Sequence, residues 1–241
     1  MLRSLFDFRT EKADVSIDAC VHYCGFRYAQ DEYNPYQTYA IELSHEVSKE
    51  KRRERFVEFL KYYRPENMTQ ALGITLSVPI PLWTYPWDRH MRHEFAQLRG
   101  WCKNPKDCPD ILTHFSKKGI LQSRIEEEFY WMERAYYSIK EHGYQPLKLK
   151  NHVEVLRLVK DDNRKSYLLL DGNHRVSAMH ALGIKKVNVI LRKSIYEREC
   201  SNWYCVRKNM VLARDALNIF NAYFCGNKNY RTTRNPAQII A

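Results

Sequence analysis

The spacing of apolar residues predicts most of the elements in the second half of the chain. Before Gly143, apolar side chains recur every three or four positions, which predicts an amphipathic helix with that glycine just past its end. The stripe consists of Phe129, Met132, Tyr136 and Ile139. Residues 147–159 largely alternate between apolar and polar, and a polar turn at 160–164 leads back to an apolar run at 167–170. We therefore predict a helix followed by a β-hairpin.

A second helix and a further strand follow the hairpin. The helix is expected to start at His174 and to be capped by Gly183, and the apolar run at 187–191 predicts the strand. Apolar residues then recur at intervals of three and four, which predicts one long helix packed on the core: Trp203, Val206, Met210, Ala213, Leu217, Phe220 and Phe224. This order of helices and strands predicts an α/β (α+β) fold.

The first 110 residues show fewer repeating patterns. Residues 39–64 are expected to form a helix that Pro65 ends, because apolar residues recur at helical spacing, at Phe56, Phe59, Leu60 and Tyr63. Glutamates interrupt the basic residues of this helix, so we interpret them as a solvated face with ion pairs: Lys49, Lys51, Arg52, Arg53 and Arg55. Prolines exclude a regular helix over 77–88, so this segment is expected to be an ordered loop that either walls a ligand pocket or covers the core.

The net charge narrows the choice of partners. The chain of 241 residues carries a formal net charge of +11, which favours anionic partners such as nucleotides, phosphorylated metabolites, nucleic acid or a phospholipid surface. The plainer interpretation is a basic protein without such a partner. No apolar run is long enough to cross a membrane, and the N-terminus lacks the apolar stretch of a secretory signal. We therefore expect a cytoplasmic protein with no membrane partner.

Metal binding has little support in the sequence. The seven cysteines lack the two-residue spacing of zinc knuckles, and most are expected to be reduced, buried thiols. A metal site at Cys20, His22 and Cys24 is a minor alternative. His90 and His93 lie three positions apart, near Glu94, but no third ligand is evident. The sequence therefore assigns no protein-bound metal site.

The most informative segment spans residues 167–183. Its apolar run stops at the turn pair Asp171 and Gly172, and a helix then begins with His174 and Arg175 in its first turn. Unpaired backbone N–H groups and the positive end of the helix dipole favour an anion at a helix start. Two donor side chains added there fit a phosphate. The plainer interpretation is an ordinary strand, turn and helix with two solvated polar residues.

Several motifs in this order resemble the ParB/sulfiredoxin domain. They are Gln122-Ser123-Arg124, the helix that ends at Gly143, Gln145-Pro146-Leu147, and the segment from Asp171 to Arg175. The resemblance covers about residues 115–195 and implies a nucleotide-binding core with a small mixed sheet. Residues 1–114 would then form a helical elaboration with the proline and aromatic loop, and residues 196–241 would add the long helix and a basic tail.

Within this superfamily, the sequence is most similar to the free serine kinases. Sulfiredoxins carry a nucleophilic cysteine where this chain has Asn173, and partitioning ParB proteins add a helix-turn-helix that the C-terminal residues here do not resemble. The resemblance implies that Glu126 or Glu127 is catalytic and that Asp171 ligates a metal ion or orients the acceptor. The plainer interpretations are acids that favour a helix start and an Asp-Gly turn. The residues implied to bind the nucleotide phosphates are Gln122, Ser123, Arg124, Gly172, Asn173, His174 and Arg175.

The resemblance thus implies a kinase that uses a nucleoside triphosphate or diphosphate (ATP, ADP or CTP) with Mg²⁺. Its acceptor would be the hydroxyl group of a small molecule, such as an amino acid or sugar derivative. The alternative is a non-catalytic module that a nucleotide switches and that binds nucleic acid or a protein. The basic residues are scattered among acids rather than gathered in a stripe, so nucleic-acid binding lacks support. A nuclease is a third interpretation, but the metal cluster it needs near Asp171 is missing from the sequence.

Overall fold

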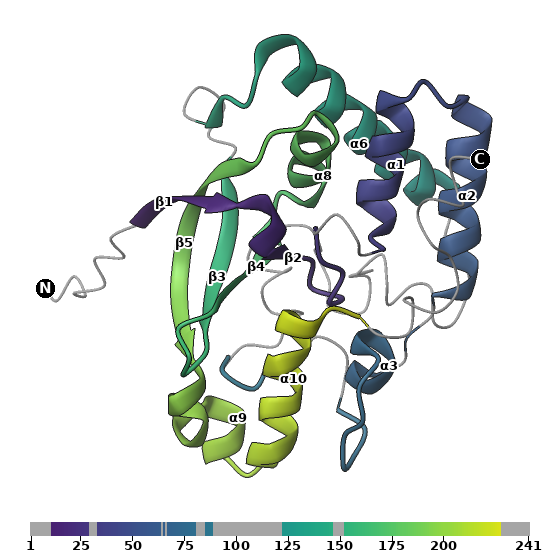
Figure 1. Cartoon of the computed structure of the whole chain (residues 1–241). Helices are drawn as coiled ribbons and strands as arrows, with labels where there is room; N and C mark the ends of the chain where they lie inside the picture. The colour runs from purple at the N-terminus through teal and green to yellow at the C-terminus, as the bar shows by residue number, and fades with distance from the viewer. Residues whose placement is uncertain are drawn as a thin grey trace, which may run out of the picture.

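A mixed sheet of five strands is the centre of the fold (Figure 1). The computed structural model describes residues 11–28, 33–63, 65, 67–80, 85–88, 122–146 and 152–227, without the side chains of residues 61, 62 and 122–124. The strands are β1 (Glu11–Ser16), β2 (Cys20–Val21), β3 (Val153–Val159), β4 (Lys165–Asp171) and β5 (Lys186–Tyr196), in the order β1-β5-β3-β4-β2. Helices pack around this sheet, which confirms the expected α/β fold.

The sheet combines the predicted hairpin with strands from both flanking segments. β3 and β4 are antiparallel neighbours joined by the polar turn, as the sequence predicts, although residues 147–151 of the predicted strand lie outside the described residues. β5 runs parallel to β3 and antiparallel to β1, and β2 runs parallel to β4. The N-terminal strands β1 and β2 therefore belong to the same sheet as the three strands found between residues 152 and 196.

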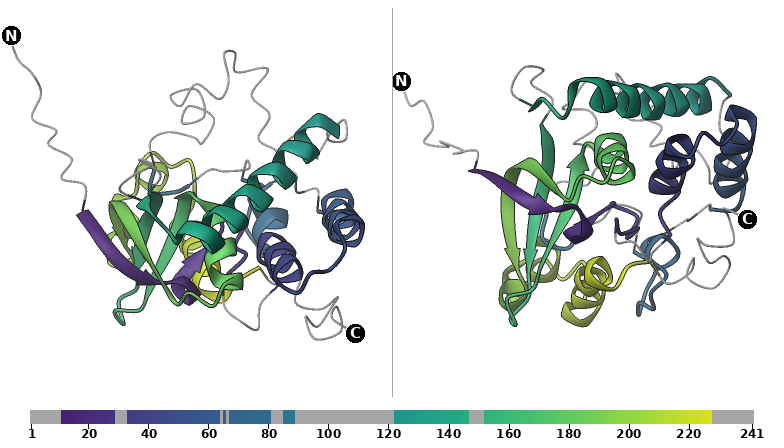
Figure 2. Two further views of the ribbon diagram at one scale, coloured as in Figure 1. Left: turned by 90° about the horizontal axis from the view of Figure 1, so that it is seen from above. Right: turned by 45° about the horizontal axis from the view of Figure 1, so that its top comes forward.

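Seven α-helices are found in the described residues. They are α1 (Pro35–Ser44), α2 (Lys49–Tyr62), α3 (Met68–Leu72), α6 (Gln122–His142), α8 (Asn173–Ala181), α9 (Tyr204–Arg207) and α10 (Ala213–Cys225). Figure 2 shows α6 running across α8, with α1 and α2 beside them. Short 3₁₀ helices at Ile17–Ala19 and Glu197–Asn202 complete the described elements.

Both faces of the sheet are covered at β4, which explains the uninterrupted apolar run in this strand. Successive residues of a strand point to opposite faces. Leu169 belongs to the core cluster that contains Val176 and Met179 of α8, whereas Leu168 belongs to the cluster that contains Phe220 of α10. Because water is excluded from both faces, the strand has no solvated side and needs apolar residues at consecutive positions. The structure thus has helices α6 and α8 on one side of the sheet and α10 on the other.

The amphipathic stripe of α6 is confirmed. Phe129, Met132, Tyr136 and Ile139 are all buried. The helix ends at His142, and Gly143 follows with a φ of 70°, a left-handed conformation that glycine adopts without strain. The long α6 therefore lies on the core along one face and leaves the opposite face to solvent.

The prediction of one helix over 39–64 is wrong, because the segment folds into α1 and α2. The break lies at residues 45–48, where Glu46 adopts a φ of 57° that a helix cannot contain. The Ser48 side chain then caps the new helix by accepting from the Lys51 backbone N–H. The four apolar positions predicted to face the core are all buried, at Phe56, Phe59, Leu60 and Tyr63.

Ion pairs form on the basic face of α2, but their partners are acids of neighbouring helices rather than the interleaved glutamates of α2 itself. Arg53 contacts Glu126 of α6 at 2.8 Å, and Arg55 forms an ion pair with Glu42 of α1. Arg52 departs from the prediction, because it is buried and lies 3.5 Å from Glu133. These pairs attach α2 to its neighbouring helices.

The prediction of one long helix over 203–224 is also wrong. The chain forms the short α9 and then α10, separated by residues 208–212. Asn209 has a φ of 55° there, which ends α9, and Met210 is exposed rather than packed on the core. Phe220 and Ala216 of α10 are buried as a core-facing helix requires.

The loop at 77–88 covers the core through Ile80, Tyr85 and Trp87, whereas residues 77–79 are exposed. Trp87 is buried, and its ring centroid lies 5.4 Å from that of Trp203 and 6.0 Å from that of Phe220. Residues 81–84 of this loop lie outside the described residues. None of the helices in the described ranges has the length and apolar character needed to cross a membrane.

Two glycines allow a test of the close approach between α8 and the sheet. Gly172 has a φ of 100°, and a Cβ atom there would lie 2.8 Å from Val153 Cγ2; Gly183 has a φ of 75° and open space around it. We expect Gly183→Ala to lower the free energy of unfolding by about 1–2 kcal/mol through backbone strain. Gly172→Ala adds a steric clash and should cost about 1–3 kcal/mol more. Urea unfolding measures the free energy of unfolding of both variants. Equal losses in the two variants would contradict the close approach of Gly172 to Val153.

Candidate phosphate site at the start of α8

The candidate site lies at the junction between the end of β4 and the start of α8. β4 ends at Asp171, and Gly172 is the N-cap residue of α8. Glycine has no side chain that could accept from the first N–H groups of the helix, and no side chain of the cap residue forms a hydrogen bond there. The first N–H groups of a helix and the positive end of its dipole together favour an anion at this position.

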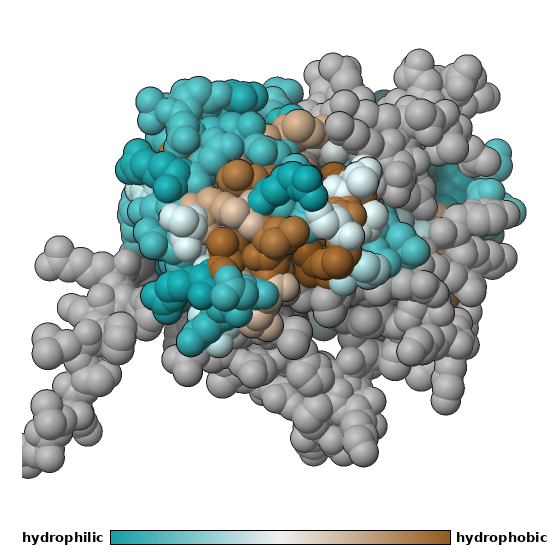
Figure 3. Space-filling model, turned by 90° about the horizontal axis from the view of Figure 1, so that it is seen from below, coloured by the Kyte–Doolittle hydropathy of each residue, from teal (hydrophilic) through white to brown (hydrophobic). Residues whose placement is uncertain are grey.

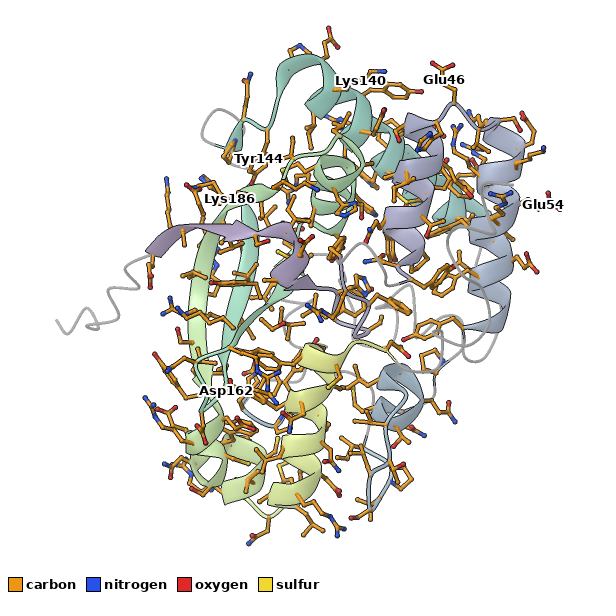
Figure 4. All side chains as sticks on the ribbon, viewed as in Figure 1. Glu46, Glu54, Lys140, Tyr144, Asp162 and Lys186 are labelled. Atoms are coloured by element: carbon orange, nitrogen blue, oxygen red, sulfur yellow. The ribbon has the colours of Figure 1, made fainter. Side chains whose placement is uncertain are left out.

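Tyr144 holds in place the part of β3 against which Gly172 packs (Figure 4). Its hydroxyl group accepts from the Val153 backbone N–H at 3.0 Å and donates to the Asn188 carbonyl oxygen at 3.2 Å. Burial raises the pKa of Tyr144, so the hydroxyl keeps its proton at neutral pH. The position of the helix start is thus set by hydrogen bonds to two strands.

A buried glutamate of α6 contacts the first turn of α8. Glu128 Oε2 lies 2.8 Å from His174 Nε2. Glu128 is 6% exposed, whereas the His174 side chain is 26% exposed. A carboxylate that is removed from water needs a donor, and the imidazole supplies one. The contact also fixes the orientation of the imidazole, since Nε2, one of its two ring nitrogens, is committed to Glu128.

Tyrosines from the N-terminal half complete the surroundings of this helix start. The ring centroids of Tyr36 and His174 are 5.6 Å apart. The Tyr28 hydroxyl group lies 3.4 Å from both the carbonyl oxygen and Oδ1 of Asn173. Burial raises the pKa of both tyrosines well above the ordinary value. The site is therefore a meeting point of α1, α6 and α8, with neutral aromatic walls.

Arg175 and Asp171 form the second charged pair of the site. Arg175 Nη2 donates to Asp171 Oδ2 at 3.1 Å. Both side chains are partly exposed, at 20% for Arg175 and 39% for Asp171. The planar guanidinium group has the donor geometry that suits a carboxylate or a phosphate.

The glutamate that faces His174 is not one of the two that the sequence singled out. Glu126 and Glu127 are both exposed, and Glu126 contacts Arg53 at 2.8 Å instead. Glu128 was missed, although helical spacing could have indicated it. It lies four positions before Met132 and three after Ile125, on the buried side of α6, whereas Glu126 and Glu127 fall outside that stripe.

The first motif of the resemblance is described only in part. Gln122, Ser123 and Arg124 form the first turn of α6, but their side chains lie outside the described ones. The helical backbone puts Arg124 one turn before Glu128. The second motif is described in full: Gly172, Asn173, His174 and Arg175 together form the start of α8.

No metal site is found among the described residues. They contain no group of three or more His, Cys, Asp and Glu side chains that could hold a metal ion. At the alternative site, His22 Nδ1 accepts from the Cys24 backbone N–H at 3.1 Å, and burial raises the pKa of Cys20 to about 12. A thiol held in its protonated form is a poor metal ligand. His90, His93 and Glu94 lie outside the described residues.

Comparisons with protein-family models, with characterised proteins and with solved structures find no match to this chain. The ParB/sulfiredoxin resemblance therefore stays a prediction from the motifs.

A comparison of two glutamate pairs tests the importance of burial. Glu128 with His174 and Glu126 with Arg53 have the same 2.8 Å separation, but only Glu128 is buried. A double-mutant cycle of Glu128→Ala and His174→Ala should give a coupling energy of about 1–3 kcal/mol. The matched cycle of Glu126→Ala and Arg53→Ala should give about 0.2–1 kcal/mol, because solvent screens an exposed pair. Equal coupling energies would contradict a special role for Glu128.

The far end of α8 provides a pH test. His180 Nε2 lies 3.3 Å from Gln37 Nε2 of α1, and burial lowers the pKa of His180 below 6.5. As the pH falls, His180 is therefore protonated in the unfolded chain before it is protonated in the folded protein. The stability that neutral His180 maintains is lost as the pH falls below about 6.5. When the pH is lowered from about 7 to 5, the free energy of unfolding should fall less in His180→Gln than in the unmodified protein. In the control His142→Gln, which changes an exposed histidine, it should fall by the same amount as in the unmodified protein.

Proposed function

We propose that the chain is a nucleotide-binding protein of the ParB/sulfiredoxin type that transfers a phosphoryl group to the hydroxyl group of a small molecule. The observation that carries this proposal is the 2.8 Å contact between Glu128 and His174 at the uncapped start of α8. This contact places an imidazole, which can accept or donate a proton, at a helix start that favours a phosphate.

The start of α8 would bind the phosphates of the nucleotide. Backbone N–H groups that follow Gly172 are suited to phosphate oxygens because no side chain of the cap residue competes for them. Arg175 adds a planar cation that can contact two oxygens of one phosphate, and Asp171 holds it in place. Asn173 supports binding rather than covalent chemistry, since an amide is not a nucleophile of the thiolate kind.

The proton-accepting role that the resemblance implied for Glu126 or Glu127 falls to His174 in this proposal, and Glu128 is its positioning residue. The Glu128 carboxylate accepts from His174 Nε2, which leaves Nδ1 able to accept the proton of the acceptor hydroxyl group. The hydroxyl oxygen then attacks the terminal phosphorus, the bond to the bridging oxygen breaks, and the shortened nucleotide leaves with that electron pair. The imidazolium that results is stabilised by the buried carboxylate beside it.

Mg²⁺ would arrive with the nucleotide rather than occupy a site of the protein alone. Mg²⁺ in such sites is held by one or two carboxylates together with phosphate oxygens and water. Asp171 offers one partly exposed carboxylate at the edge of the site, which fits this arrangement. When bound, the ion would neutralise phosphate charge.

Nucleotide-dependent phosphorylation of an added acceptor tests the proposal. ATP, ADP and CTP are supplied with Mg²⁺ and a panel of hydroxyl-bearing amino acids and sugars, and phosphoryl transfer is followed by ³¹P NMR. Glu128→Gln should lower the transfer rate by about 10²–10⁴-fold and leave nucleotide affinity nearly unchanged. Arg175→Ala should weaken nucleotide affinity by about tenfold or more.

Each variant has a control of the same residue type. Glu126→Gln changes an exposed glutamate two positions away, and Arg164→Ala removes an exposed arginine that pairs with Asp162. Both controls should behave as the unmodified protein. Nucleotide binding without turnover of any acceptor would contradict the kinase and leave a nucleotide-binding module, whereas the absence of any nucleotide binding would contradict both.

A further inference from the structure

An apolar surface lies on the side of the molecule opposite α6, where α9, α10 and the loop after α3 meet (Figure 3). We call it the lower apolar surface. Three large apolar side chains are more than half exposed there, namely Val78 (52%), Met210 (57%) and Leu212 (58%). Partly buried apolar residues extend it, namely Ile74, Leu76 and Leu217. Apolar side chains gathered in this way, rather than scattered singly, are typical of an interaction site.

Hydrogen bonds to a buried carboxylate hold the two halves of this surface together. Asp215, in the first turn of α10, is 1% exposed. The Ser77 backbone N–H donates to both of its oxygens at 3.1 Å, and the Ser77 hydroxyl group donates to Oδ1 at 3.2 Å. Asn218 Nδ2 also donates to the Thr75 carbonyl oxygen at 3.3 Å. Residues 75–78 are therefore fixed against α10, and the exposed apolar side chains belong to a preformed surface.

Cations predominate beside this surface, although the exposed Glu199 belongs to the 3₁₀ helix that packs on α9 and α10. Arg207, Lys208 and Arg214 are exposed next to Met210 and Leu212. Residues 203–214 contain no acidic residue, and residues 73–80 contain no charged residue. The buried Asp215 lies 4.0 Å from Arg214, which also donates to the Ser77 hydroxyl group, so Arg207 and Lys208 are the rim cations farther from an acid of α10. A partner that covers the apolar centre therefore meets cations at its rim and is favoured by carboxylates at matching positions.

We propose that the lower apolar surface binds an amphipathic helix of another protein that carries acidic residues beside its apolar face. Apolar side chains of such a helix would cover Val78, Met210 and Leu212, and its carboxylates would pair with the three cations. Met210 suits this use because its flexible, polarisable side chain adapts to different partners. A lipid surface is less favoured, since lipid-binding clusters contain about 4–8 basic residues and this rim offers three.

Peptide selection on the full chain tests this proposal. A phage-displayed library of random peptides of about 16 residues, or four helical turns, is selected on the unmodified protein. It is counter-selected on the double variant Met210→Ser and Leu212→Ser, which changes only exposed side chains. The enriched peptides are expected to combine apolar residues at helical spacing with Asp and Glu. Fluorescence anisotropy then measures the binding of the most enriched peptide, and the double variant should bind it about tenfold or more weakly.

Charge reversal and a matched control complete the test. Arg207→Glu with Lys208→Glu should weaken the acidic peptide and favour a version in which its acids are replaced by lysine. Tyr137→Ser, at an equally exposed apolar position on α6, should leave binding unchanged. Peptides that bind the double variant equally well, or enriched peptides without acids, would overturn the proposal. Binding to vesicles of about 30% phosphatidylserine in phosphatidylcholine, without peptide enrichment, would assign the surface to lipid and overturn it as well.

Discussion

The contact between Glu128 and His174 is the interaction on which the candidate site depends. A carboxylate that is nine-tenths buried is costly unless a donor compensates it, so α6 and α8 are held together at this point more strictly than apolar packing alone would require. Apolar contacts tolerate small shifts, whereas a hydrogen bond of 2.8 Å does not. The pair therefore determines how α6 lies over the first turn of α8, and with it the shape of the site.

A second constraint acts from the sheet. Gly172 allows the chain to turn from β4 into α8 with a φ of 100° and to lie directly against Val153. The turn and the close approach need the same residue, because a Cβ atom would meet the neighbouring strand. A glycine at the helix start also offers no side-chain acceptor of its own to the first N–H groups of α8. One small residue thus serves both the packing of the core and the chemistry of the site.

Local patterns predicted the elements of the core better than their boundaries or partners. The hairpin, α6 and α8 follow from periodicity and turn residues, which act over a few positions. The breaks at Glu46 and Asn209 were missed because a left-handed residue interrupts a helix without disturbing its apolar spacing. The pairing of β1 and β2 with distant strands depends on contacts across most of the chain, which no local pattern encodes. Glu128 was missed because it is one of three consecutive glutamates, which differ only in the side of the helix on which they lie.

The candidate site and the lower apolar surface are connected through β4. Ser166 near its start donates to the Tyr223 carbonyl oxygen of α10, and its last residue, Asp171, leads into α8. Coupling between two sites requires an element with two arrangements that both ligands bias. β4 is packed on both faces and lies between β3 and β2, so a shift of the strand would disturb both core clusters at once. A partner on α10 is therefore expected to localise the protein without changing the affinity of the site at α8.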